Sequence, residues 1–214
     1  MAHPHVPLRT GSASSPIRCA ILISGSGSGM EAMIRYQQTN VDCGHQTVLV
    51  LSDRPDVKGL DRAGRLGVDS VCVPLPSITD HAERRLQHEQ AIQKHLEMAE
   101  VELVLLSGYM RLVSPFLIHN WPNCLLNIHP SLLPAFPGAH AHRDVLAAGV
   151  NVSGCTVHYV DEGMDTGAIL AQRRVPVFPG DDVALLAERV KVEEHTLYPM
   201  VIDRLVGSSL EKAD

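Results

Sequence analysis

Short apolar runs alternate with amphipathic stretches along most of the chain, and this alternation sets the elements we expect. Buried strands are predicted at residues 19–24, 47–52, 70–74, 101–106 and 124–129, with helices near 30–36, 59–66 and 81–99. Near-continuous runs of Val, Ile and Leu between helices are typical of a parallel sheet that is covered on both faces. The first half is therefore predicted to be α/β, with a mostly parallel, doubly wound and Rossmann-like sheet.

The pattern changes after residue 129. A proline-rich segment at 130–138 is followed by β-like runs at 155–160 and 169–177 and by a closing amphipathic helix at 182–206. We expect this mixed second half to continue the same sheet. Ligands of open α/β sheets bind beyond the carboxyl ends of the strands, so the segments after residues 24, 106 and 129 are predicted to face a cleft.

Composition narrows the possible functions. The 214 residues include 18 Lys and Arg against 24 Asp and Glu, which gives a net charge of −6. Such a chain lacks the long-range attraction to nucleic acid or anionic membrane that a basic chain has, and no apolar stretch approaches the roughly 20 residues of a membrane helix. Five scattered cysteines without a CxxC motif indicate neither a disulfide framework nor a zinc site. We expect a cytoplasmic protein without a nucleic-acid, membrane or zinc partner, and this composition still allows a local basic pocket for a small phosphate ligand.

A glycine-rich loop connects the first strand to the first helix. Its sequence from Ser24 to Gly29 is SGSGSG. Backbone N–H groups at a helix N-terminus form an anion site, so the loop is a candidate for binding a phosphate, and a plain tight turn is the alternative. It is neither the dinucleotide fingerprint, because Met30 stands where a glycine is needed, nor a Walker loop.

Polar side chains end the strand at 124–129. Asn127 and His129 lie two residues apart and therefore point to one face. An Asn amide can polarise a carbonyl oxygen, and a His can transfer a proton near neutral pH. Asp165, in an acidic connection between two β-like runs, is a candidate carboxylate for orienting or charging the imidazole, or else a solvated turn residue.

Other histidines carry less weight. His81, His88 and His95 recur every seven residues on a charged helix, which predicts a solvent-exposed face rather than a metal site. His140 and His142 are predicted to lie in a mobile loop.

Taken together, these motifs resemble the folate-dependent formyltransferases, and in particular the phosphoribosylglycinamide formyltransferase family of purine biosynthesis. The matching segments are ISGSGS from Ile23, LSGYMRL from Leu106, LNIHPSLLP from Leu126, GCTVHYV from Gly154 leading to Asp165, and Glu194-His195. That family usually has Asn where Gly29 stands, so only a backbone N–H is available here.

The resemblance implies a reaction and a division of the chain. The donor would be 10-formyltetrahydrofolate, and the acceptor would be the amine of a phosphoribosyl glycinamide. Asn127 and His129 would stabilise the oxyanion, and Asp165 would assist proton transfer without a metal. Independently of the resemblance, residues 1–16 are rich in Pro, Gly, Ser and His and are expected to be a disordered extension. The single formyltransferase domain at 17–214 would comprise a phosphate-binding half at about 17–120 and a folate-binding, catalytic half at about 121–214.

The resemblance also assigns binding residues. The acceptor would contact Gly27, Ser28, Gly29 and Glu194. The folate would contact Arg85, Met110, Arg111, Leu112, Val113, Asn127, Asp161, Glu162, Gly163 and Met164. The oligomeric state is expected to be a monomer or a homodimer.

Three alternative functions remain at this point. The first is a formyltetrahydrofolate deformylase, a family that shares the residues matching Asn127, His129 and Asp165. Deformylases resemble this chain but are longer, with an additional amino-terminal regulatory domain. Methionyl-tRNA formyltransferases add a carboxy-terminal RNA-binding domain. A non-catalytic nucleotide sensor, with Asp53 gripping a ribose, is the third alternative, and the incomplete glycine fingerprint counts against it.

Overall fold

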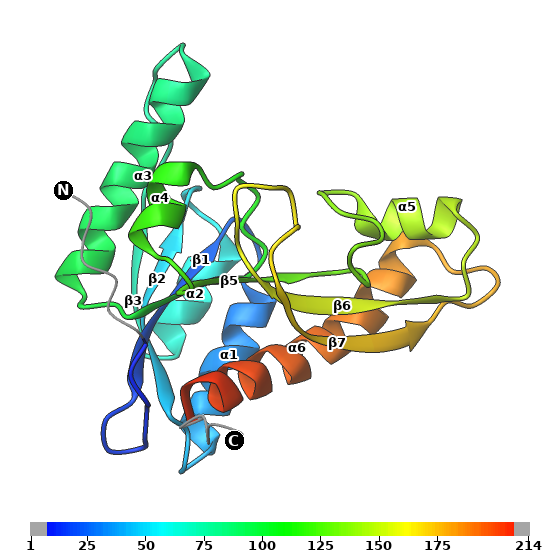
Figure 1. Cartoon of the computed structure of the whole chain (residues 1–214), viewed down its shortest axis with the longest axis horizontal. Helices are drawn as coiled ribbons and strands as arrows, with labels where there is room; N and C mark the ends of the chain where they lie inside the picture. Colours follow the sequence, from blue (N-terminus) through cyan, green and yellow to red (C-terminus); the bar gives the residue numbers. More distant parts are fainter. Residues whose placement is uncertain (1–7, 208–214) are drawn as a thin grey trace, which may run out of the picture.

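A seven-stranded mixed sheet forms the centre of the computed structural model, which describes residues 8–207 (Figure 1). The strands are β1 (Ile17–Ile23), β2 (His45–Ser52), β3 (Asp69–Cys72), β4 (Leu103–Leu106), β5 (Leu125–His129), β6 (Val152–Tyr159) and β7 (Ile169–Pro176). Their order is β3-β2-β1-β4-β5-β6-β7. The first five strands pair in parallel, and β6 pairs antiparallel with both of its neighbours, β5 and β7. The predicted parallel first half and mixed second half are confirmed.

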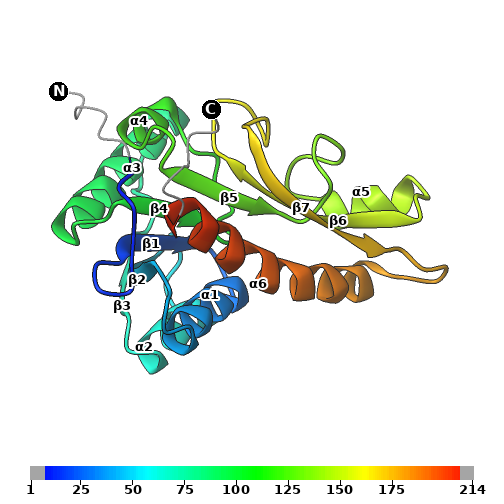
Figure 2. The same cartoon turned by 60° about the horizontal axis from the view of Figure 1, so that its bottom comes forward.

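Helices cover both faces of this sheet. They are α1 (Ser28–Thr39), α2 (Lys58–Arg65), α3 (His81–Met98), α4 (Pro115–Asn120), α5 (Ala141–Ala147) and α6 (Val183–Gly207). Figure 2 shows α6 running along one face beside α1, while α3 and α4 lie on the other. The doubly wound arrangement expected from the continuous apolar strands is therefore present.

The residues of β1 show how one strand supplies two cores. Successive side chains of a strand point to opposite faces of the sheet. Cys19 and Ile21 pack in the core with α1 and α6, whereas Ala20 and Leu22 pack in the core with α3 and α4. Because both faces are buried, the strand is apolar at every position rather than at alternate ones.

Two short helices have no counterpart in the predicted elements. The first is α4, which begins at a proline in its first turn, and the second is α5, which follows the proline-rich segment. His142 lies in α5, so the prediction that it belongs to a mobile loop was wrong. Ala141 and Val145 are buried on this helix and give it a packed face.

The predicted exposed stripe of histidines was wrong for His88. This side chain is only 3% exposed, and its Nε2 atom lies 2.9 Å from the Tyr109 hydroxyl. Burial lowers its pKa from the usual value. The face of α3 that packs against the sheet also contains the polar residues Glu89 and Gln93. Because polar residues occur on the buried face as well, the seven-residue repeat of histidines does not show which face is exposed.

Part of the expected amino-terminal extension packs on the body of the protein. Arg9 pairs with Glu102 at 2.6 Å, and the Gly11 N–H donates to the Val206 carbonyl. The expectation of disorder was therefore wrong for residues 8–16, and residues 1–7 lie outside the described range. Ion pairs and backbone hydrogen bonds with residues distant in sequence hold this polar segment, which apolar patterning does not reveal.

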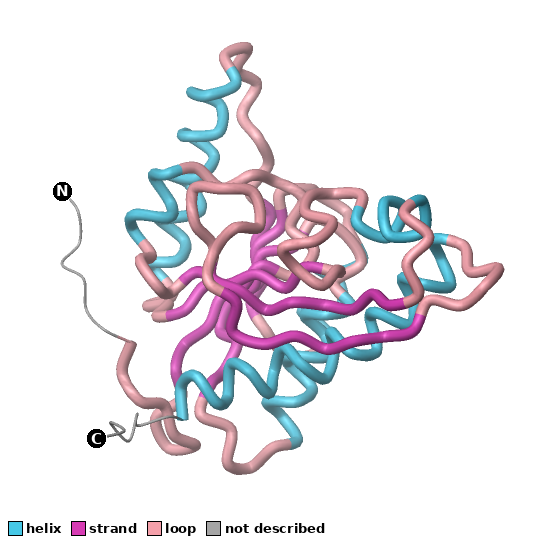
Figure 3. The backbone as a smooth tube through the Cα atoms, turned by 45° about the vertical axis from the view of Figure 1, so that its right-hand side comes forward, coloured by secondary structure: helices cyan, strands magenta, loops and turns pink. Residues whose placement is uncertain are grey.

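The glycine-rich turn follows the carboxyl end of β1 and another loop follows that of β4, so both lie at the same edge of the parallel part of the sheet. Figure 3 shows loops, in pink, crowded over one side of the strands. Over residues 8–207, none of the helices is both long and apolar enough to span a membrane.

Candidate functional site

A cleft of about 850 Å³ lies at this edge of the sheet. The turn after β1, the segment after β4, the end of β5, the β6–β7 connection and α6 all contribute to its lining. Every residue that the formyltransferase resemblance assigns lines it, namely Gly27, Ser28, Gly29, Arg85, Met110, Arg111, Leu112, Val113, Asn127, His129, Asp161, Glu162, Gly163, Met164, Asp165 and Glu194. The fold thus brings together residues that are up to 167 positions apart in sequence (27 to 194).

His129 is held from two sides at the end of β5. Its Nε2 atom lies 2.9 Å from the Phe136 carbonyl oxygen, and its Nδ1 atom lies 3.3 Å from Asp165 Oδ2. A carbonyl oxygen only accepts hydrogen bonds, so Nε2 carries a proton and donates it. The ring therefore has an oxygen acceptor beside each nitrogen, and these two contacts fix its orientation.

Asp165 links the two loops that cover the end of the strand. Its Oδ2 atom also accepts a hydrogen bond of 2.8 Å from the Gly138 N–H. Its backbone has φ of 56°, the left-handed region, which Asp and Asn tolerate better than most residues. The carboxylate is thus directed inward from the connection between β6 and β7 toward His129, as a solvated turn residue would not be.

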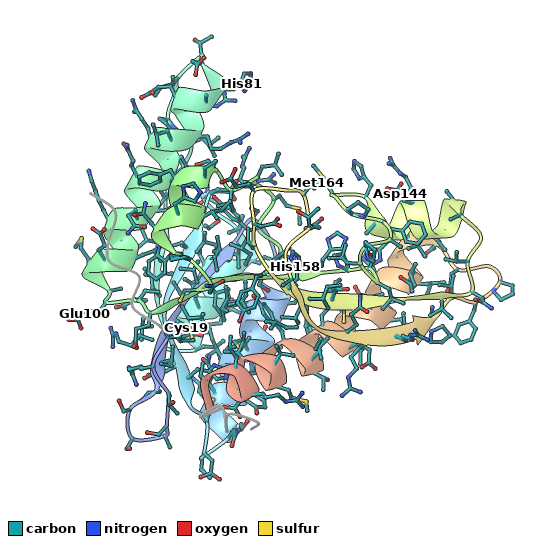
Figure 4. The ribbon with its side chains drawn as sticks, viewed as in Figure 1. Cys19, His81, Glu100, Asp144, His158 and Met164 are labelled. Carbon is teal, nitrogen blue, oxygen red and sulfur yellow. The ribbon has the colours of Figure 1, made fainter. Side chains whose placement is uncertain are left out.

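His158 was not among the candidates predicted from the sequence. It stands opposite Asn127 in the antiparallel pairing of β5 with β6, and the loop with Met164 lies above it in Figure 4. Its Nδ1 lies 2.8 Å from the Tyr159 carbonyl, so Nδ1 donates and Nε2 is left as an acceptor. The Asn127 amide donates to that Nε2 atom at 3.3 Å.

This contact orients the Asn127 side chain. Burial lowers the pKa of His158, which keeps the ring neutral and its Nε2 atom an acceptor near neutral pH. The His158 Nε2 atom is also 3.6 Å from Asp165 Oδ1, so one carboxylate lies between two imidazoles. The sequence could have indicated His158 as a candidate, because it is a histidine inside an apolar strand. Its contact with Asn127, however, follows only from the register of β5 and β6.

The glycine-rich turn leads directly into α1. Gly27 precedes the helix with φ of 68°, and a Cβ atom there would lie 2.7 Å from the Gly59 Cα atom. No side chain caps the first N–H groups of α1. A backbone that only glycine adopts easily therefore presents the helix N-terminus to the cleft, an arrangement that suits an anion.

Two charged side chains of α6 face this part of the cleft. Burial raises the pKa of Glu194 to about 7. The positive charge of Lys191 lowers this pKa, but its effect is smaller than that of burial. Lys191, which sequence reasoning missed, also lines the cleft and bonds Glu188 on its own helix. Lys191 lies three residues before Glu194, about one helical turn away, and this spacing could have indicated from the sequence that both side chains lie on one face of the helix.

The segment after β4 forms the opposite wall. Ser24 Oγ accepts a hydrogen bond of 2.8 Å from the Met110 N–H, which fixes this segment to the glycine-rich turn. Met110 and Leu112 are more than half exposed although they are apolar. Exposed apolar side chains in a cleft suit a flat, largely apolar ligand.

Asp53 does not reach the cleft. Its side chain is 0% exposed, and its Oδ2 atom accepts a hydrogen bond of 2.7 Å from Arg111 Nε. It is therefore not available to grip a ribose, as the alternative of a nucleotide sensor requires. Its contact leaves the terminal nitrogens of Arg111, which lines the cleft, for other partners.

Among residues 8–207, one cluster with metal-ligand chemistry lies outside the cleft. Atoms of Cys43, His45 and Asp203 come within 4.8 Å of one another near the start of β2, at the opposite end of the strand from the cleft. Gln37 Nε2 donates a hydrogen bond to His45 Nδ1 at 2.8 Å, whereas His45 Nε2 lies 3.9 Å from Asp203 Oδ1 and has no hydrogen-bond partner.

Comparison with known proteins completes the description of the site. The family model described as "Formyl transferase" matches residues 17–202. The phosphoribosylglycinamide formyltransferase of Bacillus subtilis is 41% identical over 189 residues, which cover 88% of this chain and 94% of that protein. A crystal structure of glycinamide ribonucleotide transformylase 1 from Symbiobacterium toebii has a TM-score of 0.83 and 42% identity, covering 89% of this chain and 88% of that one.

Longer relatives contain a similar segment. The trifunctional purine biosynthetic protein adenosine-3 of Drosophila pseudoobscura pseudoobscura is 41% identical over 196 residues, which cover 91% of this chain. The chain spans only 14% of the length of that relative.

Proposed function

Because the chain belongs to the formyl transferase family, we propose that it transfers the formyl group of 10-formyltetrahydrofolate to the amine of 5-phosphoribosylglycinamide, a step of purine biosynthesis. The observation that carries the proposal is the joint position of Asn127, His129 and Asp165 in a cleft that also contains an open helix N-terminus. One end of this cleft suits a phosphate, and the other suits an apolar ring system.

The reaction needs an oxyanion stabilised and a proton moved. The acceptor amine attacks the formyl carbon, and the new C–N bond places negative charge on the formyl oxygen. Collapse of this tetrahedral intermediate breaks the bond to the folate nitrogen, which takes up a proton as tetrahydrofolate leaves. Hydrogen-bond donors that are already oriented toward the oxyanion lower the barrier most.

Asn127 is the donor that is held ready. Its amide is oriented by His158, so one N–H is directed to that ring and the second remains for the formyl oxygen. The Nε2–H of His129 is occupied by the Phe136 carbonyl. We propose that folate binding displaces this carbonyl and transfers the hydrogen bond to the oxyanion. Phe136 has φ of 56°, an unfavourable backbone conformation whose release would assist the change.

Asp165 balances the charge during proton transfer. At 3.3 Å from His129 Nδ1, its carboxylate orients the ring that would donate to the oxyanion. The same carboxylate can accept the proton that the attacking amine loses, through a water, and return it to the folate nitrogen. This path requires neither a covalent enzyme intermediate nor a metal.

The acceptor's phosphate is proposed to bind at the start of α1. Backbone N–H groups of Gly27, Ser28 and Gly29 would donate to it, and Lys191 would add the positive charge that the loop lacks. Glu194, on the next turn of α6, would accept hydrogen bonds from the ribose hydroxyls or the glycinamide. Its raised pKa suits a group that is buried until a polar ligand arrives.

The folate is proposed to lie along the opposite wall. Met110, Leu112 and Val113 would contact the pteridine ring, and the backbone of Asp161–Met164 would form hydrogen bonds to its edge. Arg85 and Arg111 are proposed to pair with the carboxylates of its glutamate. The division into a phosphate-binding half and a folate-binding half, about 17–120 and 121–214, remains our proposal.

A two-substrate assay tests the function. The protein should form tetrahydrofolate, followed by absorbance, only when the phosphoribosyl glycinamide is present, and mass spectrometry should find the acceptor heavier by one formyl group. Release of formate without the acceptor would instead identify a deformylase. We further propose that the protein is cytoplasmic, since all five cysteines are unpaired. We also propose that it is a monomer or a homodimer.

A further inference from the structure

The connections of the sheet diverge between β1 and β4. In the order β3-β2-β1-β4-β5, the chain after β1 continues to one side and the chain after β4 continues to the other, although the two strands lie next to each other (Figure 2). Such a divergence opens a crevice, and this is where open α/β sheets hold their ligands. The glycine-rich turn lies on one side of the crevice, and Ser107, the residue after β4, lies on the other.

The backbone around Ser107 is fixed, whereas its hydroxyl is free. The Ser107 N–H donates to the Leu22 carbonyl at 3.0 Å, and the neighbouring Gly108 carbonyl accepts a hydrogen bond of 3.1 Å from the Ser24 N–H. The side chain lines the cleft and is half-buried. In the part of the chain that the structure describes, the Ser107 hydroxyl forms no hydrogen bond. A hydroxyl that is held in place without a partner is available to a ligand.

Gly29 leaves the room that this hydroxyl occupies. A Cβ atom at Gly29 would lie 2.5 Å from Ser107 Oγ, and the next nearest atom would be Ser107 Cβ at 3.9 Å. Gly29 is the second residue of α1, and its φ is not in the left-handed region. The lack of space beside Ser107, and not the backbone conformation, therefore accounts for a glycine at this position.

The hydroxyl also lies beside the first turn of α1. The helix begins at Ser28 without a side-chain cap, and Glu31 is the first residue whose N–H donates to a carbonyl one turn back. The N–H groups before Glu31 have no partner in the helix. A serine hydroxyl can donate a hydrogen bond and carries no negative charge, so Ser107 adds one more donor to a set that suits an anion.

We propose that Ser107 is a binding residue for the phosphate of the acceptor, and that residue 29 is a glycine because a side chain there would displace the Ser107 hydroxyl. The inference rests on the proposed function, since that function places the phosphate at the start of α1. Ser107 would approach the phosphate from the side of β4, across the crevice from the glycine-rich turn. Donors from two strands would thus fix the direction in which the phosphate, and with it the glycinamide amine, enters the cleft.

Direct binding of the phosphoribosyl glycinamide, measured by calorimetry, tests the role of the hydroxyl. Ser107→Ala should raise the Kd about tenfold, the usual size for one hydrogen bond to a charged group at a partly exposed site. The Kd for 10-formyltetrahydrofolate should stay within about twofold of native. Ser70→Ala, which removes an exposed hydroxyl of β3 outside the cleft, is the matched control and should bind both ligands as the native protein does. A native acceptor Kd in Ser107→Ala would overturn the proposal.

Gly29→Ala tests the close approach of the two residues. Its methyl group would take the place of Ser107 Oγ, so the hydroxyl would turn to another rotamer and lose the phosphate. The acceptor Kd should again rise about tenfold. In the double variant the hydroxyl is already absent, so the loss should stay near tenfold instead of multiplying to about 100-fold. Multiplied losses would show that the two residues act independently and would overturn the proposed reason for the glycine.

A helical control separates this effect from a general effect of alanine. Gly64→Ala changes a glycine of α2 that has no atom within 4 Å of a Cβ position and lies outside the cleft. It should leave the acceptor Kd unchanged. Alanine is more favourable than glycine in a helix, so both glycine variants should fold. A tenfold loss in Gly64→Ala as well would remove the special role of Gly29.

The riboside that lacks the phosphate identifies the group that the hydroxyl contacts. Ser107→Ala should bind this riboside as the native protein does, because the proposed partner is missing from it. An equal loss for the riboside and for the phosphorylated acceptor would place the contact on the sugar and would overturn the proposal.

Failure of the proposed function gives a different result. If the native protein binds the acceptor but transfers no formyl group, the function is wrong, and the binding comparison still decides the role of Ser107. If the native protein does not bind the acceptor, both proposals are wrong. Normal formyl transfer with native acceptor binding in Ser107→Ala would refute the role of the serine alone.

Discussion

Replacing Asp165 by Asn tests the proposed proton path most directly. The substitution keeps the size of the side chain and suits the left-handed backbone at this position, where φ is 56° and Asn is well tolerated. An alanine at this position would confuse the lost charge with backbone strain. The variant should therefore fold, and its melting temperature should fall by no more than a few degrees.

The size of the effect follows from the distance to His129. Two unit charges 3.3 Å apart attract by about 5 kcal/mol at an effective dielectric constant of about 20. Only part of this energy bears on the barrier, because the carboxylate is not fully shielded from water. Loss of one acid–base partner typically costs about 10²- to 10⁴-fold in rate. We expect kcat to fall by at least about 100-fold, with KM for both substrates within about tenfold.

The assay is the initial rate of tetrahydrofolate formation, measured from pH 5.5 to 9. Asp61→Asn, which removes a carboxylate from the surface of α2, is the matched control and should keep the native rate. A kcat within about threefold of native would remove the Asp165 charge from the mechanism. A large rise in KM with native kcat would assign the carboxylate to binding instead.

Three further predictions concern the acceptor subsite and the amino-terminal segment. Because the pKa of Glu194 is raised to about 7, the KM for the phosphoribosyl substrate should decrease about tenfold as pH rises from 6 to 8 and the carboxylate ionises; Glu194→Gln should flatten this profile. Gly27→Val should weaken binding of the phosphoribosyl substrate at least tenfold and leave folate binding unchanged, because the left-handed backbone and the close approach of Gly59 exclude a side chain. Glu102→Gln should lower the free energy of unfolding by about 0.5–1 kcal/mol, because its pair with Arg9 is partly exposed; denaturant titration measures it.

Each of these has a contradicting outcome. An identical pH profile in native protein and Glu194→Gln would exclude that carboxylate from acceptor binding. Equal loss of both ligands in Gly27→Val would indicate a misfolded site. Unchanged stability in Glu102→Gln would mean that Arg9 contributes nothing to holding the amino-terminal segment.

Local sequence patterns determined the elements and much of the cleft. The continuous apolar runs of β1, β2, β4 and β5 predicted a parallel sheet, because a strand that is buried on both faces is apolar at nearly every position. The period of two in a strand put Asn127 and His129 on one face. The carboxyl ends of parallel strands meet at one edge, which is why the turn after β1 and the end of β5 now share a cleft.

Only the tertiary structure decided how side chains from distant segments meet. The pairing of Asn127 with His158 depends on the register of β5 and β6. Burial of His88 depends on which face of α3 meets the sheet, and the packing of Arg9 depends on a glutamate 93 positions away. Asp53, placed by sequence at a strand end, turns inward to Arg111. Periodicity records the environment of a residue and its neighbours along one element, whereas partners across elements are set by register and packing, which no local pattern contains.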